Sequence, residues 1–387
     1  MNTPAEVATT QVPSCDLVAQ YLAIRPELDA AIAEVLLGGE FERDQHLWDF
    51  EDEFARSCGV AHGVGVGSGL AAVMLSLKAL GIGPGDEVIT VPNTDIATCA
   101  AITHAGAQIV WSDVDERTHN LDPEKVEQLI TARTKAILAV SLYGLPADMP
   151  RLRELADRYH LWLVGDAALA YGAAIDDIPV GALADVSCFS FAPRKVLGAY
   201  GDGGMVVTQN PAVATKVRHL AGYGEPRRDG MADKDGRIHI EVEGYHVHLD
   251  VLQAAILRVK LPHVPAWVSR RQEIAASYAQ LLSGGTVELP FVPQGFTHVF
   301  RSFVVRVPHR DEVYRRLAAR GIETSLLYTP PLHLQTAYRR LGRRVGDFPV
   351  VESLANSLLC LPMYPELPDE SVQFVASELL DAVASCR

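Results

Sequence analysis

The sequence predicts an α/β protein: a large domain with a mostly parallel sheet between helices, and a smaller α+β C-terminal domain. Two observations predict this fold. Short apolar runs alternate with amphipathic segments up to about residue 210, the pattern of strands covered on both faces by helices. Helical sequence then dominates, with one clear strand. We place the large domain at residues 25–265 and the small domain at 266–387, together with 1–24.

The elements of the large domain follow from these patterns in order. Apolar residues recur at helical spacing at 18–37 and 50–55. Short apolar runs then predict strands at 63–66, 87–91, 108–114, 135–140, 161–164, 186–191 and 204–208. Amphipathic segments between them predict helices at 71–80, 97–105 and 149–159.

The remaining sequence predicts the small domain. Leu-, Ala-, Ile- and Val-rich spacing predicts a helix at 250–264, and a second helix at 270–282 ends before Gly284 and Gly285. An apolar run predicts a strand at 303–307. A helix at 312–320 is ended by Gly321.

Composition excludes several classes of protein. The chain has 387 residues and a net charge of -14, which argues against a nucleic-acid partner. Six scattered cysteines without a C-x-x-C pair indicate reduced thiols and no metal site, as in a cytoplasmic protein. We expect no signal peptide, and no stretch approaches 18 uninterrupted apolar residues, so we expect no membrane span.

A lysine and an aspartate carry the main chemical signal. Lys195 ends the run Ser-Phe-Ala-Pro-Arg-Lys and is followed by a glycine-rich segment, while Asp166 ends an apolar strand. A strand-end aspartate, then a lysine, then a glycine loop is a recurring layout for binding pyridoxal 5'-phosphate (PLP). The lysine amine forms a Schiff base with the aldehyde, and the carboxylate keeps the pyridine nitrogen protonated.

A glycine-rich turn upstream predicts a site for the phosphate. Gly-Val-Gly-Ser-Gly at 65–69 follows an apolar strand and precedes a helix, so free backbone amides are expected at Ser68, Gly69 and Leu70. A plain tight turn is the alternative. Ser190 could donate a hydroxyl to the same phosphate or could simply cap its strand.

These runs, together with others in the same order, resemble the DegT/DnrJ/EryC1/StrS family of fold-type I PLP enzymes. The resemblance covers about residues 20–380. It rests on Gly-Pro-Gly-Asp-Glu-Val-Ile at 83–89, Thr-His-Asn-Leu-Asp-Pro at 118–123, Pro-Leu-His-Leu-Gln at 331–335, Gly-Asp-Phe-Pro at 346–349 and Leu-Pro-Met-Tyr-Pro at 361–365. The Gly-Asp-Gly-Gly at 201–204 is most similar to the branch that aminates keto-deoxysugars.

The resemblance implies specific roles. Lys195 would carry PLP, Asp166 would pair with the pyridine nitrogen, and Gly69, Leu70 and Ser190 would hold the phosphate. The family forms homodimers with shared active sites, so the segment 245–249 would reach into the neighbouring subunit.

Several positions depart from the family pattern. The aromatic residue that stacks on the pyridine ring is replaced by Asp95, which could be an acid or base or the N-cap of the following helix. A glutamine near the phenolic oxygen is replaced by Leu169, and the threonine of the phosphate turn by Leu70. These changes indicate a remodelled pocket.

Other departures concern the segment expected to reach the partner. An asparagine and an arginine are replaced by His246 and His248, which could bind phosphate when protonated or could pack at the dimer interface. Leu327 replaces a histidine before a tyrosine.

Arginines near the lysine leave a further pair of alternatives open. Arg194, Arg227 and Arg228 could meet anionic substrate groups or be solvated.

The resemblance implies an aminotransferase that moves an amino group from a donor, expected to be L-glutamate, to a nucleotide-linked keto-deoxysugar in antibiotic or deoxysugar biosynthesis. The departures leave two alternatives: another PLP reaction, such as elimination, epimerisation or amination of a non-sugar ketone, or a non-catalytic protein with the PLP fold. In the family's sugar dehydratases histidine replaces the lysine, so Lys195 counts against that branch.

Overall fold

A seven-stranded sheet forms the centre of the computed structural model, which describes residues 11–42, 44–225, 240 and 242–386. Its strand order is β1-β9-β8-β5-β4-β2-β3. Strand β9 pairs antiparallel with both of its neighbours, β1 and β8, and the other pairs in the sheet are parallel. The predicted mostly parallel sheet is therefore confirmed. The strands are β1 (His62–Val66), β2 (Glu87–Thr90), β3 (Gln108–Trp111), β4 (Thr134–Val140), β5 (Trp162–Asp166), β8 (Val186–Ser190) and β9 (Gly204–Thr208).

Helices cover both faces of this sheet, and side chains alternate between two cores. On β9, Val206 joins the core that contains α4 (Gly69–Ala79), whereas Met205 and Val207 join the core formed with α3 (Gln45–Ser57) and α9 (Val251–Lys260). This alternation is the period of a strand buried on both faces. Further helices of this part are α5 (Ile96–Ala105), α6 (Pro123–Glu127), α7 (Met149–Tyr159) and α8 (Pro211–Ala221).

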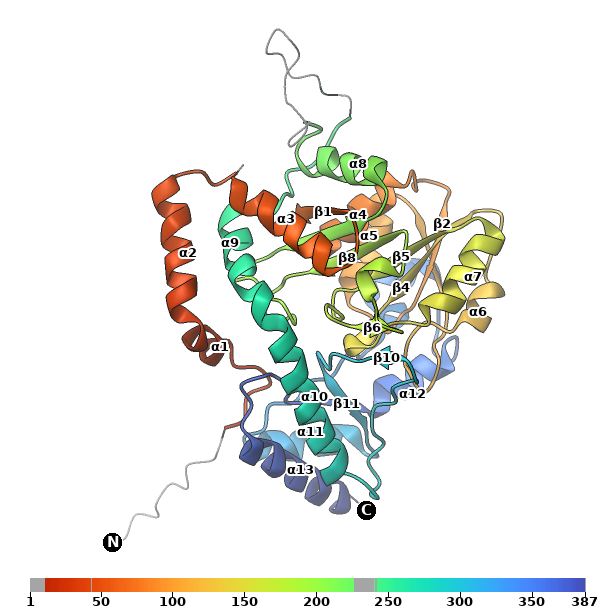
Figure 1. Ribbon diagram of the computed structural model, residues 1–387. Coiled ribbons are helices and arrows are strands. Elements are labelled where there is room, and N and C mark those ends of the chain that lie inside the picture. Colours follow the sequence, from red (N-terminus) through yellow and green to blue (C-terminus); the bar gives the residue numbers. More distant parts are fainter. Residues whose placement is uncertain (1–10, 43, 226–239, 241, 387) are drawn as a thin grey trace.

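The N-terminal helical stretch is broken, although the sequence predicts one run at 18–37. Helix α1 (Leu17–Ala23) ends at Ile24, and α2 (Arg25–Gly38) begins there with Pro26 in its first turn. Proline lacks a backbone N–H and is accepted only in the first turn of a helix, so the break falls just before it. Helix α2 packs along α9 (Figure 1).

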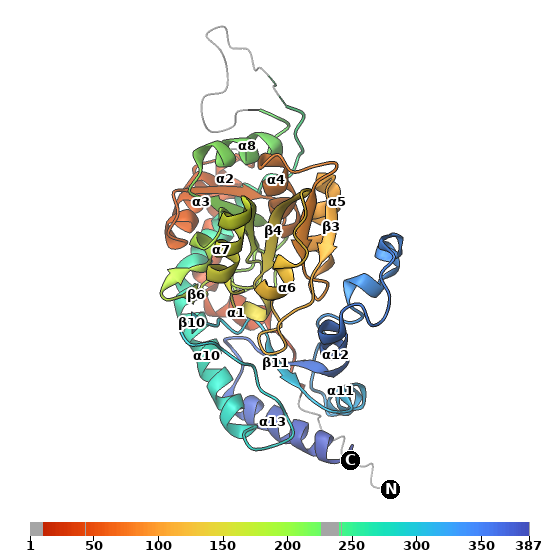
Figure 2. The same cartoon turned by 90° about the vertical axis from the view of Figure 1, so that its right-hand side faces the viewer.

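A further core lies at the end of the molecule opposite α8 (Figures 1 and 2). There β11 (Phe303–Arg306) pairs antiparallel with β12 (Leu358–Leu361), which the sequence analysis did not identify. Val12 from the N-terminal segment joins the same core. The helices of this part are α10 (Val264–Leu281), α11 (Arg310–Ala319), α12 (Pro349–Ser357) and α13 (Asp369–Ala384). The domain limits at 25, 265 and 266 stay a prediction.

Smaller elements complete the fold. A three-stranded sheet joins β10 (Phe296–Thr297) to β6 (Ala174–Ile175) and β7 (Ile178–Pro179). Short 3-10 helices lie at Leu142–Gly144, Val180–Ala182, Leu261–His263, Leu332–Leu334 and Thr336–Leu341. No helix in the described part of the chain has the length and apolar character that crossing a membrane requires.

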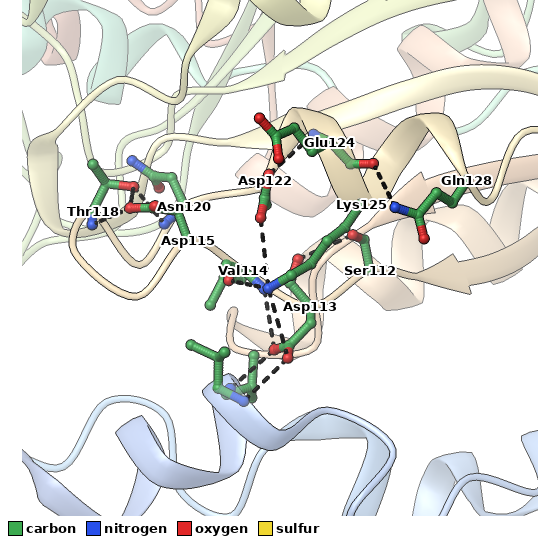
Figure 3. Close-up of polar contacts among 12 residues, drawn as sticks. Ser112, Asp113, Val114, Asp115, Thr118, Asn120, Asp122, Glu124, Lys125 and Gln128 are labelled. Carbon is green, nitrogen blue, oxygen red and sulfur yellow. Dashed lines mark hydrogen bonds and ion pairs between the residues drawn. The ribbon is translucent and has the colours of Figure 1, made fainter.

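The loop after β3 holds helix α12 against the large sheet (Figure 3). The Asp113 carboxylate accepts hydrogen bonds from the first backbone amides of α12, those of Val350 (3.1 Å) and Val351 (3.0 Å). Lys125 lies 3.9 Å from this carboxylate and donates to the Val114 carbonyl at 2.8 Å. Negative charge at a helix N-terminus is favourable, so this contact ties the C-terminal elements to the sheet.

Candidate active site

A cavity of about 230 Å³ opens where the parallel strands end. Loops after β1 and β2 and the last residues of β5 and β8 all contribute to its wall. The carboxyl ends of parallel strands are the usual ligand site of such a sheet. The cavity brings together every predicted site residue except His246: Ser68, Gly69, Leu70, Asp95, Asp166, Leu169, Ser190 and Lys195.

One end of the cavity is the N-terminus of α4. Ser68 is the N-cap of this helix, and its hydroxyl accepts a hydrogen bond from the Ala71 amide at 3.1 Å. The preceding helical amides, those of Gly69 and Leu70, lie at the helix end, where no carbonyl one turn earlier is available to them. A Cβ added at Gly69 would lie 2.7 Å from the Cβ of Ser190. Glycine therefore lets the helix start and Ser190 approach closely, and the result is an anion cradle.

Lys195 lies on the loop after β8. Burial and the nearby Arg301 guanidinium lower the pKa of its amine to about 8, against the opposing effects of Asp166 and Asp95. A lysine with a pKa near 8 has a substantial neutral fraction at physiological pH. Only the neutral amine is a nucleophile, so this environment favours attack on an aldehyde.

Asp166 ends β5 with its carboxylate buried. It accepts a hydrogen bond from the Thr98 hydroxyl at 2.7 Å and one from the Ala168 amide at 3.2 Å. Burial raises the pKa of this carboxyl, while the two hydrogen bonds and Lys195 oppose the rise. A buried carboxylate is most stable beside a cation. The site is therefore suited to a protonated ring nitrogen.

Two threonines that the sequence pattern did not single out, Thr94 and Thr98, also line the cavity. The Thr94 and Thr98 hydroxyls lie 2.9 Å apart, and both side chains are buried. Because the single proton of Thr98 is donated to Asp166, Thr94 must donate to Thr98. Thr98 lies three residues after Asp95, on the first turn of α5. This short distance in the sequence from a predicted site residue was the signal that could have identified Thr98 as a site residue.

Comparisons with known proteins agree with this geometry. The model of the DegT/DnrJ/EryC1/StrS aminotransferase family matches residues 23–380. The chain belongs to this family.

Two relatives are named for sugar amination. The dTDP-3-amino-3,4,6-trideoxy-alpha-D-glucose transaminase of Streptomyces venezuelae is 44% identical over 95% of this chain and 94% of its own. The UDP-N-acetyl-3-dehydro-alpha-D-glucosamine 3-aminotransferase of Acidithiobacillus ferrooxidans is 41% identical over 95% of this chain and 97% of its own. The crystal structure of S. venezuelae DesV with a ketimine intermediate superposes with a TM-score of 0.92, at 42% identity over 96% of this chain and 98% of that one.

Three positions where this chain departs from the family pattern line the cavity as well. Asp95 is the N-cap of α5, as one of the two alternatives predicts, because its carboxylate accepts from the Ala97 amide at 2.9 Å. Leu169 and Leu70 contribute apolar surface. Tyr328, which the sequence analysis did not select, comes from the C-terminal part and adds an aromatic ring to the wall.

His246 lies outside the cavity of its own chain. Its ring stacks on Tyr223 with centroids 4.8 Å apart and meets His248 edge-on at 4.8 Å. Its backbone pairs with Gly222 at the end of α8. A role in a partner's site stays a prediction. Arg227 and Arg228 lie outside the described residues.

The cavity offers a suitable partner for each reactive part of PLP. Lys195 suits the aldehyde, Asp166 suits the pyridine nitrogen, and the amides of Gly69 and Leu70 with the hydroxyl of Ser190 suit the phosphate. A Cβ at position 69 would crowd Ser190, so glycine allows the start of α4 and the Ser190 hydroxyl to lie together as one cradle. The residues present therefore fit this cofactor.

Proposed function

We propose that this protein is a PLP-dependent aminotransferase that moves an amino group from L-glutamate to a nucleotide-linked keto-deoxysugar. The observation that carries the proposal is the placement of Lys195 and Asp166 in one cavity whose wall includes the N-terminus of α4. When bound, PLP supplies an electron sink that stabilises negative charge on the substrate carbon.

The protein's own residues supply the remaining chemistry. With the cofactor bound, Lys195 would hold its aldehyde, and the free Lys195 amine would be the base that moves a proton between the substrate α-carbon and C4′ of the cofactor. This transfer needs a base whose pKa is near the working pH, which the surroundings of Lys195 provide. Asp166 would hold a proton on the pyridine nitrogen, and the hydroxyl of Thr98 holds the Asp166 carboxylate in place.

The substrate class follows from the relatives. Both are named for amination at carbon 3 of a nucleotide-linked hexose, one carried by dTDP and the other by UDP. We therefore propose a 3-keto hexose nucleotide as the acceptor. A cytoplasmic location and a homodimer with shared sites belong to the same proposal.

Replacing the lysine tests this function. Lys195→Ala protein should lose the visible absorbance band of bound PLP. It should also lose amine transfer from L-glutamate to dTDP- and UDP-linked 3-keto hexoses, which mass spectrometry of a panel of these substrates measures. Lys135→Ala is the matched control, because this exposed lysine lies at the amino end of β4, away from the cavity. Unchanged turnover in the Lys195→Ala protein would refute the proposal.

A further inference from the structure

A second cavity, of about 140 Å³, lies beside the first and is lined by three arginines. Adjacent residues connect the two cavities. Arg194 and Leu327 line the second cavity, whereas the residues that follow them in the sequence, Lys195 and Tyr328, line the first. The Arg301 guanidinium, which lines the second cavity, also acts on the Lys195 amine and lowers its pKa, so the two cavities are close in space.

The guanidinium groups of Arg194, Arg271 and Arg301 form no ion pair with a carboxylate in the part of the chain that the structure describes. Arg271 donates instead to the carbonyls of Phe300 (3.3 Å) and Met363 (2.8 Å). These bonds fix Arg271 in the cavity wall.

Arg301 keeps more of its donors available. It donates to the Ser302 hydroxyl at 2.9 Å. The Nε atoms of Arg301 and Arg271 are both buried, and neither finds an acceptor among the described residues. A buried donor without an acceptor is costly, so this arrangement favours a bound anion.

The charges around the cavity lead to the same conclusion. Burial, followed by repulsion from Arg301, lowers the pKa of Arg271 to about 10. Glu366 and Glu323 are the acidic groups that act on this cluster, through Arg271 and Arg194 respectively, and neither forms an ion pair with them among the described contacts. Three guanidinium groups stand against these two carboxylates, so the cluster keeps a net positive charge next to Lys195.

We propose that this cavity binds a carboxylate of the substrate, with Arg301 and Arg194 as its ligands. Guanidinium groups bind carboxylates through paired hydrogen bonds. We assign the carboxylate to the amino donor, because in an α-amino acid one bond separates the carboxylate carbon from the carbon that bears the amine. The phosphates of a nucleotide-linked sugar lie farther from the reacting carbon. This inference rests on the proposed function.

Binding of glutarate tests the carboxylate site without any reaction, because glutarate has two carboxylates and no amine. Isothermal titration of the full-length, PLP-loaded protein should show binding that Arg301→Gln weakens by at least about tenfold, the loss expected for hydrogen bonds to a charged group. Arg301→Lys should retain part of the affinity. Arg320→Gln is the control, since Arg320 is exposed and pairs with Glu378 in the same part of the molecule. Equal glutarate affinity in wild-type and Arg301→Gln protein, or no binding, would overturn the site.

Half-reactions then identify the source of the carboxylate. In Arg301→Gln protein, a raised half-saturation concentration for L-glutamate with an unchanged value for the keto substrate supports the donor. The reverse result would overturn that assignment. PLP loading is read separately from the visible band: a protein that binds glutarate but not PLP refutes the proposed aminotransferase and leaves the carboxylate site standing.

Discussion

At the scale of residues, reactivity in this protein depends on where charge is placed. Lys195 and Asp166 have ordinary side chains whose pKa values are moved in opposite directions, and burial is the main cause for both. Burial disfavours the charged form of each group. A neutral amine and a carboxylate that needs a cation are therefore brought together in the cavity that fits PLP.

The lowered pKa of Lys195 predicts how PLP loading depends on pH. The amine is protonated below a pKa of about 8, so the rate of Schiff-base formation with added PLP should rise with pH up to about 8 and then level off. Removing the Arg301 charge by Arg301→Gln should raise the Lys195 pKa and move this midpoint to higher pH. Stopped-flow absorbance at a series of pH values measures it. A midpoint near 10.5 in the wild-type protein would contradict the account.

The hydrogen bond from Thr98 to Asp166 predicts that Thr98 positions the Asp166 carboxylate. Thr98→Val keeps the shape but removes the hydrogen bond to the carboxylate, which is worth about 1.5–3 kcal/mol and corresponds to a loss of about 10- to 100-fold in kcat. The Asp166 pKa should also rise, so the activity profile should shift to higher pH. Thr103→Val is the control on the same helix, where the hydroxyl bonds only the Ala100 carbonyl. A shift of equal size in both variants would indicate a general effect on α5.

At the scale of elements, the approach of α4 to β8 forms the anion cradle. Gly69→Ala should weaken PLP binding by about 1–3 kcal/mol, because the added methyl group would lie 2.7 Å from Ser190 and must displace it. An absorbance titration with PLP measures the affinity. Gly83→Ala is the matched control, since its nearest neighbour would lie at an ordinary 3.7 Å. Equal PLP affinity in the two variants would count against the cradle.

The sequence alone predicted the strands of the large sheet, because each is a short apolar run. It also predicted the site loops after them, because a glycine-rich turn and an aspartate at the end of a strand are recognisable in a few consecutive residues. It also predicted the N-cap role of Asp95 as an alternative. It could not predict that Tyr328 and Arg301, which are remote in sequence, reach the region of Lys195, since these placements depend on how the C-terminal part packs against the sheet. It joined α1 to α2 because apolar spacing continues across Pro26, although proline begins a new helix there.

At the scale of the whole molecule, the proposed dimer predicts that active sites are shared. Lys195→Ala protein and the double variant His246→Ala/His248→Ala should each have low activity. Refolding them together should restore activity, because one site of the mixed dimer then has an intact lysine and the partner's intact histidines. Measuring transamination before and after mixing tests this.

The control for mixing uses two variants whose altered residues come from the same subunit of each proposed site. Lys195→Ala and Asp166→Asn both alter residues that line one cavity within one chain. Their mixture should stay inactive, because every site of the mixed dimer lacks one of the two residues. Restoration in this control, or none in the histidine mixture, would contradict a site built from both subunits.

The identity of the lysine that carries PLP tests the central claim most directly. Lys260 is a second buried lysine with a pKa lowered to about 8, but its amine donates to the Gly198 carbonyl at 2.6 Å and does not line the cavity. Reduction of the PLP-loaded protein with borohydride, followed by peptide mass spectrometry, locates the attachment. We predict the added mass on Lys195. The same mass on Lys260 or on any other lysine, or no added mass at all, would contradict the account.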